Sequence, residues 1–148
     1  MALITQLSRW RSERGAELIE FAIVAPILML LLAGIFDFGM MFRTYEAVTN
    51  AAREGARVGV LPGYAPADVQ SRVGQYLTAA GLSGAYTVNV VNVPVATGAG
   101  VFTARSVTVN YPYQFVILGG VGPLFGGSFG SISLQAVSVM RTESAAAP

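Results

Sequence analysis

Cysteine and histidine are both absent from the chain. Without cysteine there can be no disulfide and no thiolate metal site. Without histidine the chain lacks the commonest general base and the commonest metal ligand. Serine and threonine hydroxyls are plentiful, but the sequence offers no imidazole to activate them. We therefore expect no catalytic residue, no metal, no cofactor and no enzymatic activity.

Lysine is absent too, and the basic residues are arginines scattered along the sequence. The formal net charge is +1 over 148 residues, without the basic stripe that binding to a phosphate backbone requires. Acidic residues are sparse beyond Gly59, where only Asp68 and Glu143 occur. A paired-carboxylate active site would need those two to converge, and no motif indicates that they do. We therefore expect no nucleic-acid partner and a binding or structural role.

The dominant feature that is present is a long apolar run. No charge occurs from Phe21 to Phe36, and only Asp37 interrupts the run beyond it. A hydrophobic helix needs roughly 20 residues to cross a bilayer, and no turn signal separates this run from the amphipathic segment that follows. We predict one helix over residues 16–60 that spans a membrane at about residues 18–42. Asp37 is expected at the outer membrane–water boundary, with its side chain reaching water.

The charges before the apolar run predict its orientation. Arg9, Arg11 and Arg14 outweigh Glu13, and positive charge beside an apolar span usually stays in the cytoplasm. We expect a single-pass protein of the inner membrane with its N-terminus in the cytoplasm and its C-terminal head outside. A secretory signal peptide is the alternative, but its apolar region is shorter and a small-x-small cleavage site follows it. Neither condition is met here.

A possible processing site precedes the span. The stretch R-G-A-E-L-I-E-F, residues 14–21, resembles the cleavage motif of type IV prepilins, and more closely that of Flp/Tad-type prepilins. The resemblance implies cleavage by a prepilin peptidase between Gly15 and Ala16, which would make residues 1–15 a basic leader. It places Glu20 at the fifth position after the cut and the aromatic Phe21 directly after it.

The resemblance extends along the helix. The blocks E-F-A-I-V-A-P, I-F-D-F-G and T-N-A-A-R-E-G-A-R are similar to successive blocks of the TadE/TadG-like pseudopilins of Tad pilus systems. The match is dense over about residues 13–60, and Asp37 departs from it because glutamate is expected there more often. It implies a minor pilin or pseudopilin of a Tad (Flp) type IV-like pilus. Such a protein is anchored in the membrane before assembly and helps to prime or cap the filament for surface attachment.

The same resemblance implies the partners. These are other pilin and pseudopilin subunits, the prepilin peptidase, the inner-membrane pilus assembly platform and the lipid bilayer. The protein would reside in the inner membrane and then in the extracellular pilus. The alternative is a single-pass, membrane-anchored binding or adhesion module that is never assembled into a filament.

Glu20 is the main candidate for subunit assembly. An ionisable group near the entry to a membrane helix is costly when it is unpaired. Glu20 either stays hydrated at the headgroup level or pairs with the new α-amino group of Ala16 on a neighbouring subunit, which would set the axial register. The surrounding motif favours pairing. Glu17, three residues earlier, lies on a neighbouring part of the helix and could share or compete for that partner, and Phe21 completes the predicted assembly site.

A stripe of small residues follows the span. Ala47, Ala51, Gly55 and Gly59 recur at a spacing of four, and small residues allow another backbone to approach closely. The partner of this stripe is either the chain's own sheet or the helix of another subunit. We favour the first for the upper turns of the helix.

Residues 61–143 predict a small α+β head. Pro62 and Gly63 end the long helix, and residues 67–80 place Val69, Val73, Tyr76, Leu77 and Ala80 on one face of a second helix. Gly81 is the expected C-cap. Alternating segments within 86–93, 107–113 and 132–141 predict an antiparallel sheet of about three strands. A change of phase predicts a bulge or strand end near Val90, and residues 144–148 are expected to be a disordered end.

Residues 115–130 form an unusual segment, FVILGGVGPLFGGSFG, which is uncharged and carries six glycines. So many glycines disfavour a single packed helix. Three interpretations stay open for this segment. It is an interaction surface, a loop folded over the sheet edge, or a segment that touches the outer membrane leaflet beside the helix.

Overall fold

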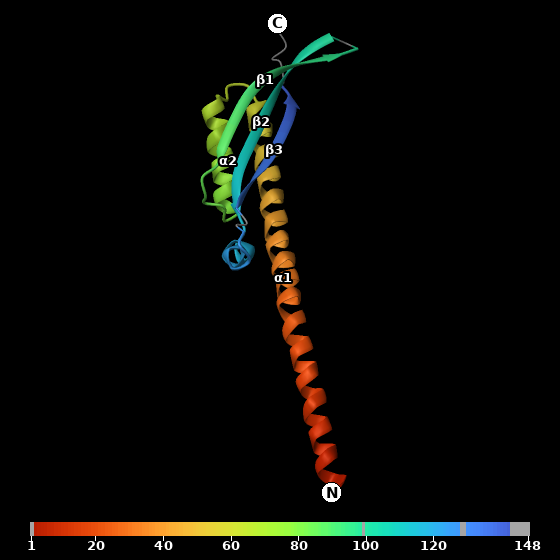
Figure 1. Ribbon diagram of the computed structural model, residues 1–148. Helices are drawn as coiled ribbons and strands as arrows, with labels where there is room; N and C mark the ends of the chain where they lie inside the picture. The colour runs from red at the N-terminus through yellow and green to blue at the C-terminus, as the bar shows by residue number, and fades with distance from the viewer. Residues whose placement is uncertain (1, 99, 128–129, 143–148) are drawn as a thin grey trace.

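The computed structural model describes residues 2–98, 100–127 and 130–142, with side chains from residue 15 onward apart from 97, 124 and 125. The predicted disordered end lies outside these residues. The long N-terminal helix, second helix and three-stranded sheet confirm the predicted α+β class (Figure 1). The elements in chain order are α1 (Ala2–Gly59), α2 (Pro66–Ala79), β1 (Thr87–Thr97), β2 (Gly100–Gln114), α3 (Ile117–Val121), the 3-10 turn η1 (Gly122–Phe125) and β3 (Ser131–Arg141).

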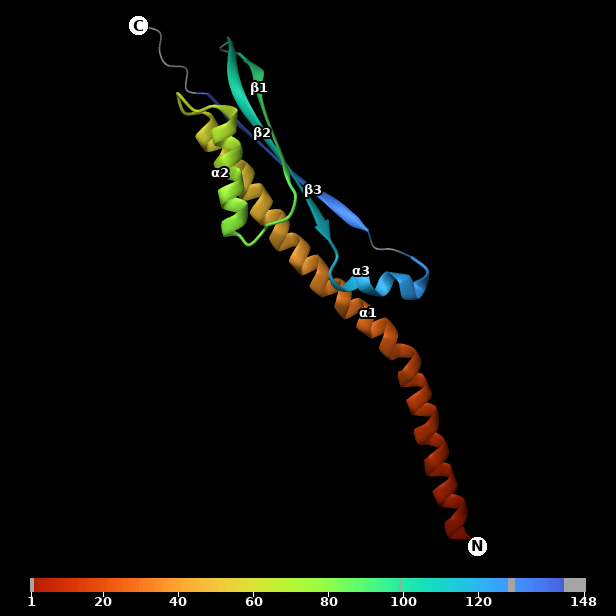
Figure 2. The same cartoon turned by 90° about the vertical axis from the view of Figure 1, so that its left-hand side faces the viewer.

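The helix α1 dominates the shape of the molecule. It is continuous over 58 residues, and its N-terminal half projects away from the head while its C-terminal half packs beneath the sheet (Figure 1). The projecting half bends (Figure 2) and contains Pro26. A proline within a helix cannot donate to the carbonyl four residues back, which is a usual cause of such bends. Gly63 then reverses the chain with a φ of 85°, a conformation that glycine adopts without a steric penalty.

The short helix α2 has a signal at each end. At its start the Asp68 carboxylate accepts a hydrogen bond from the backbone N–H of Ala65 at 2.8 Å, where a negative charge also complements the helix dipole. At its end Gly81 has a φ of 79°, and the N–H of Leu82 donates to the carbonyl of Leu77 at 2.9 Å. These bonds satisfy carbonyl groups that the helix end would otherwise leave unpaired. The C-cap is Ala80, one residue before the predicted Gly81, which takes the left-handed position directly after the cap.

The sheet is antiparallel, with the strand order β1-β2-β3. The bulge predicted near Val90 is wrong, because Val90 pairs with Val107 and Val91 pairs with Ser106 without interruption. Val91 is 44% exposed on the outer face of the sheet. The change of phase in the sequence therefore reflects an apolar residue facing out, not an inserted residue.

The core lies between the inner face of the sheet and the two helices α1 and α2. Helix α2 lies beside the upper part of α1, and the sheet covers both (Figures 1 and 2). Burial of these apolar side chains is the main favourable term that holds the head together. The buried cluster comprises Val48, Ala51, Ala52, Ala56, Val69, Val73, Leu77, Val107, Val109 and Ala136.

Helix α1 packs tightly against α2 at Gly55. A Cβ added at Gly55 would lie 2.5 Å from Cγ2 of Val73 and 3.4 Å from side-chain atoms of Val69 and Val107. Val73 is β-branched and therefore cannot rotate away easily. The small stripe thus faces the chain's own head at this point, and a larger residue has no room.

We expect Gly55→Ala to destabilise the head although alanine is the better helix former. The gain in helix propensity of about 1 kcal/mol is outweighed by an overpacking cost of about 1–3 kcal/mol. The free energy of unfolding of the solubilised protein measures the balance. Gly39→Ala is the matched control, because a Cβ there would meet nothing within 4 Å. Equal stability of the two variants would contradict the packing described.

Candidate functional site

The projecting half of α1 is the first part of the candidate site. Within the described residues one helix, Gly15–Gly59, is long and apolar enough to cross a membrane, and no part of its most apolar window is buried in the chain. An apolar surface of this extent is unusual for a soluble monomer and marks contact with lipid or protein. Its exposed side chains include Leu18, Ile19, Phe21, Ile23, Ile27, Met29, Leu31, Ile35 and Phe36.

The predicted processing and assembly residues all lie on this projecting half. Gly15 and Ala16 are within the continuous helix, and a Cβ at Gly15 would meet nothing within 4 Å. Glu17 and Glu20 are exposed, and Phe21 is 67% exposed. Within the described part of the chain neither glutamate forms a hydrogen bond or an ion pair. Any partner of these carboxylates must therefore come from outside the described residues.

The small stripe lies at the other end of α1, inside the head. Ala51, Gly55 and Gly59 are buried and Ala47 is half-buried. A Cβ at Gly59 would lie 2.8 Å from Cδ of Arg105 on β2, so that turn also packs on the chain's own sheet. The structure therefore separates the stripe from the predicted assembly residues and does not bring the two sets together.

Asp37 is the residue whose role sequence reasoning missed. The expectation that its side chain reaches water is wrong, because Asp37 is 0% exposed. Its Oδ1 accepts hydrogen bonds from the backbone N–H groups of Val116 at 3.2 Å and Ile117 at 3.1 Å. Its Oδ2 accepts from Ile117 at 3.0 Å and from Leu118 at 2.7 Å. Three backbone N–H groups at the start of α3 thus take the place of water around the carboxylate.

Aromatic side chains pack next to the Asp37 backbone. The hydroxyl of Tyr113 donates to the backbone carbonyl of Asp37 at 3.2 Å. The ring of Phe115 packs edge-to-face on Phe38 and on Tyr113, with centroid distances of 5.9 and 5.6 Å. Such aromatic pairs contribute to the stability of the fold beyond the effect of the apolar area that they bury. We call Asp37, Phe38, Tyr113, Phe115 and the N–H groups of 116–118 the junction, because they join the projecting half of α1 to the end of β2.

The Gly-rich segment continues from the junction as α3 and η1. Ile117 and Val121 line a groove with Pro26 and Phe36 of α1, and Leu118 lines a second groove on that helix. Helix α3 therefore lies against the projecting half of α1, and the described part of the segment is not folded over the sheet edge. Two features of the sequence could have indicated this arrangement. Asp37 is a single acidic residue in an apolar helix, and residues 115–130 form a long uncharged segment.

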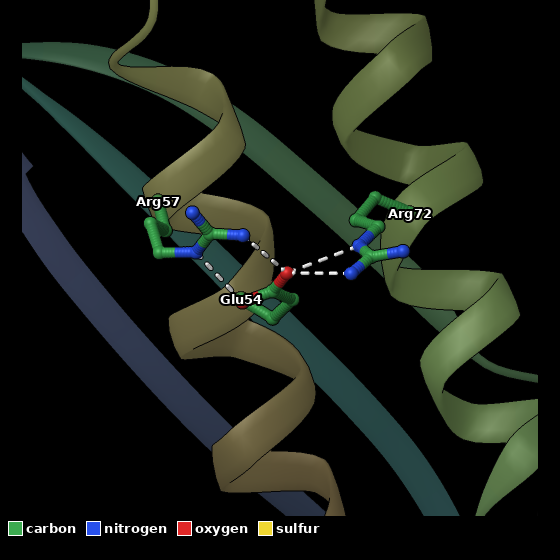
Figure 3. A network of polar contacts seen from close by, with 3 residues as sticks. All are labelled: Glu54, Arg57 and Arg72. Carbon is green, nitrogen blue, oxygen red and sulfur yellow. Dashed lines mark hydrogen bonds and ion pairs between the residues drawn. The ribbon is translucent and has the colours of Figure 1, made fainter.

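A second polar cluster joins α1 to α2 (Figure 3). Arg57 donates to both carboxylate oxygens of Glu54, each at 2.9 Å. Arg72 on α2 donates to Oε1 of Glu54 from Nη2 at 2.8 Å and from Nε at 3.1 Å. The hydrogen bonds from Arg57, and then those from Arg72, lower the pKa of Glu54 from 4.5 to about 2. This cluster links α1 to α2 by hydrogen bonds and ion pairs.

The Glu54 cluster should make the head lose stability in acid. Because folding lowers the pKa of Glu54, its stabilisation is complete above pH of about 4.5 and is lost as the pH falls through about 2. The arginine side chains are 63% and 46% exposed, so solvent screening limits the effect to about 1 kcal/mol. Unfolding measured against pH should show a shallower acid loss for Glu54→Gln than for wild type or Glu46→Gln. Parallel curves for all three would contradict this.

The carboxylates Asp68 and Glu143, which a catalytic interpretation would pair, are not seen together. Asp68 caps the start of α2, and Glu143 lies outside the described residues.

Together the fold and the exposed helix define an α+β protein with a long N-terminal helix that could span a membrane. Comparison with known families identifies the helix further: the model of the TadE-like proteins matches residues 15–57. The match confirms the resemblance seen in the sequence, and the chain is TadE-like over residues 15–57. It covers the exposed part of the helix and the stripe as far as Gly55, but not Gly59, α2 or the sheet. Searches of the curated proteins and of the solved structures found no match.

The TadE-like match carries the functional class. It indicates similarity to Tad pilus-associated, pilin-like proteins over less than half of the chain. Its pilus context implies other pilin subunits as partners.

Proposed function

We propose that this chain is a minor pilin or pseudopilin of a Tad (Flp) type IV-like pilus, which helps to prime or cap the filament for surface attachment. Before assembly α1 holds it in the inner membrane, with the N-terminal side in the cytoplasm and the head outside. One observation carries the proposal. A TadE-like helix presents an apolar half that almost nothing in its own chain covers.

That bare helix suits a subunit that exchanges one apolar environment for another. In the membrane, lipid covers the exposed side chains. In a filament, the helices of neighbouring subunits would cover the same surface by van der Waals packing. The inner-membrane assembly platform would move the subunit between the two states, and a prepilin peptidase would first remove residues 1–15.

The unpaired Glu20 gives this packing a register. Its carboxylate is exposed and has no partner within the described chain. A neighbouring subunit cut after Gly15 would offer the α-amino group of Ala16. The two charges attract each other more strongly as water is excluded from the helix bundle, so pairing favours one axial offset between subunits.

The folded head supports a minor role. Major Flp-type subunits are usually little more than the helix, whereas this chain adds α2 and a three-stranded sheet. The alternative function is a membrane-anchored binding or adhesion module that never enters a filament. The two differ in whether the bond after Gly15 is cut and whether α1 leaves the bilayer.

Processing separates these functions. Gly15→Val should leave the leader attached, because a branched side chain obstructs approach of the peptidase to the bond. The space around Gly15 is open, so the substitution should leave the fold intact. Intact mass of the membrane-extracted protein should show loss of residues 1–15 in wild type and retention in the variant.

Gly34→Val is the matched control, since the space around Gly34 is also open and the residue lies beyond the motif. It should be cut like wild type. A wild-type mass that still includes residues 1–15 would contradict processing and favour the anchored module.

A further inference from the structure

Residues 115–127, which we call the foot, lie at the level of the predicted membrane span. The foot runs sideways from α1, below the sheet (Figure 2). Ile117 and Val121 line a groove with Ala33 and Phe36, two positions in the outer part of the range 18–42 that we expect to cross the membrane. If that part of α1 is in the bilayer, the side chains that line a groove with it are at the same depth.

The side chains of the foot suit lipid better than water. The foot carries no charge. Val116 is 63% exposed and Ile117 is 38% exposed, although both are large and apolar. Ile117 lines the same groove as Phe36, which is 65% exposed on α1. Exposed apolar side chains therefore occur on the span and on the foot at the place where the two meet.

Backbone N–H groups of the foot also have hydrogen-bond partners within the protein, as an environment without water requires. In hydrocarbon, polar backbone groups need partners within the protein. Asp37 accepts the N–H groups at the start of the foot, from residues 116–118. Beyond α3, the N–H of Gly122 donates to the carbonyl of Leu118, and the N–H of Gly127 donates to the carbonyl of Gly122 at 3.1 Å.

The depth of Asp37 agrees with this placement. At about 1.5 Å per residue, Asp37 lies about 26 Å along α1 from Glu20, and a hydrocarbon core is roughly 30 Å thick. The carboxylate thus falls at the outer edge of the core if Glu20 marks the inner edge. A charge there is costly unless it is paired, and the hydrogen bonds from the foot stabilise it.

We propose that the foot inserts into the outer leaflet of the bilayer. The protein then holds the membrane at two places, by the span of α1 and by a second contact within one leaflet. Two contacts fix the height and the rotation of the head above the membrane, which a single helix would leave free. This inference rests on the membrane anchor of the proposed function and adds lipid as the partner of the foot.

The absence of cysteine allows a direct test with single cysteines. Val116→Cys reports on the foot, Ile23→Cys on the span and Val101→Cys on the far end of the sheet; the native side chains are 63%, 65% and 73% exposed. Each is labelled with an environment-sensitive fluorophore. The full chain is then reconstituted in phosphatidylethanolamine–phosphatidylglycerol vesicles that contain lipids spin-labelled near the glycerol or near the chain end.

We expect lipid quenching of the probes at positions 23 and 116 but not at position 101, with the probe at 116 quenched more by the shallow spin label. Quenching at 23 but not at 116 would overturn the foot alone. No quenching at 23 would overturn the membrane anchor, and with it the proposed function. A probe at 116 that is shielded from lipid while the unlabelled cysteine cross-links to a second copy would also overturn the proposal, in favour of a contact between subunits.

Discussion

Asp37→Ala is expected to release α3 from α1 while leaving the head folded. The substitution removes the acceptor of three backbone N–H groups at Val116, Ile117 and Leu118. The bond at Leu118 is buried and those at Val116 and Ile117 are partly buried. A buried donor left without a partner costs about 1–3 kcal/mol, so the local loss is about 3 kcal/mol. Hydrogen exchange of these amides in the micelle-bound protein should therefore accelerate roughly 100-fold.

Two variants sharpen this test. Asp37→Asn keeps one carbonyl acceptor and should give an intermediate rate. Glu46→Ala removes an exposed acid from the same helix and should leave the exchange unchanged. Unchanged protection in Asp37→Ala would show that the aromatic contacts hold the junction without the carboxylate.

Glu20→Gln is expected to abolish incorporation into filaments while cleavage, membrane insertion and folding proceed normally. Glutamine keeps the size and polarity of the side chain and removes only its charge, and with it the attraction to the amino group of a neighbouring Ala16. Glu20 contacts no part of the head, so stability of the head should not change. Recovery of the protein in sheared filaments, relative to the membrane fraction, measures the effect.

Glu17→Gln is the matched control for Glu20→Gln. It removes an equally exposed carboxylate one turn earlier and should reduce incorporation only mildly. A Glu20→Gln protein that assembles and supports piliation like wild type would show that the carboxylate is merely hydrated at the membrane surface. The axial register would then be set by apolar packing of the helices.

The elements with strong local signals could be predicted from the sequence. The apolar run without turn residues predicted the long helix, and the 3.6-residue spacing of Val69, Val73 and Leu77 predicted the buried face of α2. Gly81 predicted the end of that helix. Each of these signals depends on neighbouring residues, so the rest of the fold was not needed to interpret it.

The junction could not be predicted, because its partners are distant and carry no side-chain signal. Asp37 is bonded to backbone N–H groups 79 to 81 residues further along the chain. Every residue except proline has a backbone N–H group, so the residue types around position 116 do not indicate that these groups bind a carboxylate. The prediction of a bulge near Val90 failed for a different reason. Val91 is an apolar residue exposed on the outer face of the sheet, and its side chain suggests, in the sequence alone, that the inward-facing pattern has shifted.

The most direct test of the central claim is whether the chain becomes part of a filament. Pili sheared from cells and purified should contain the head of this protein, detected by an antibody, with an intact mass that begins at Ala16. A small amount relative to the major subunit is expected, since the chain is proposed as a minor component. A protein found only in the inner membrane, and absent from purified filaments of a normally piliated strain, would contradict the account.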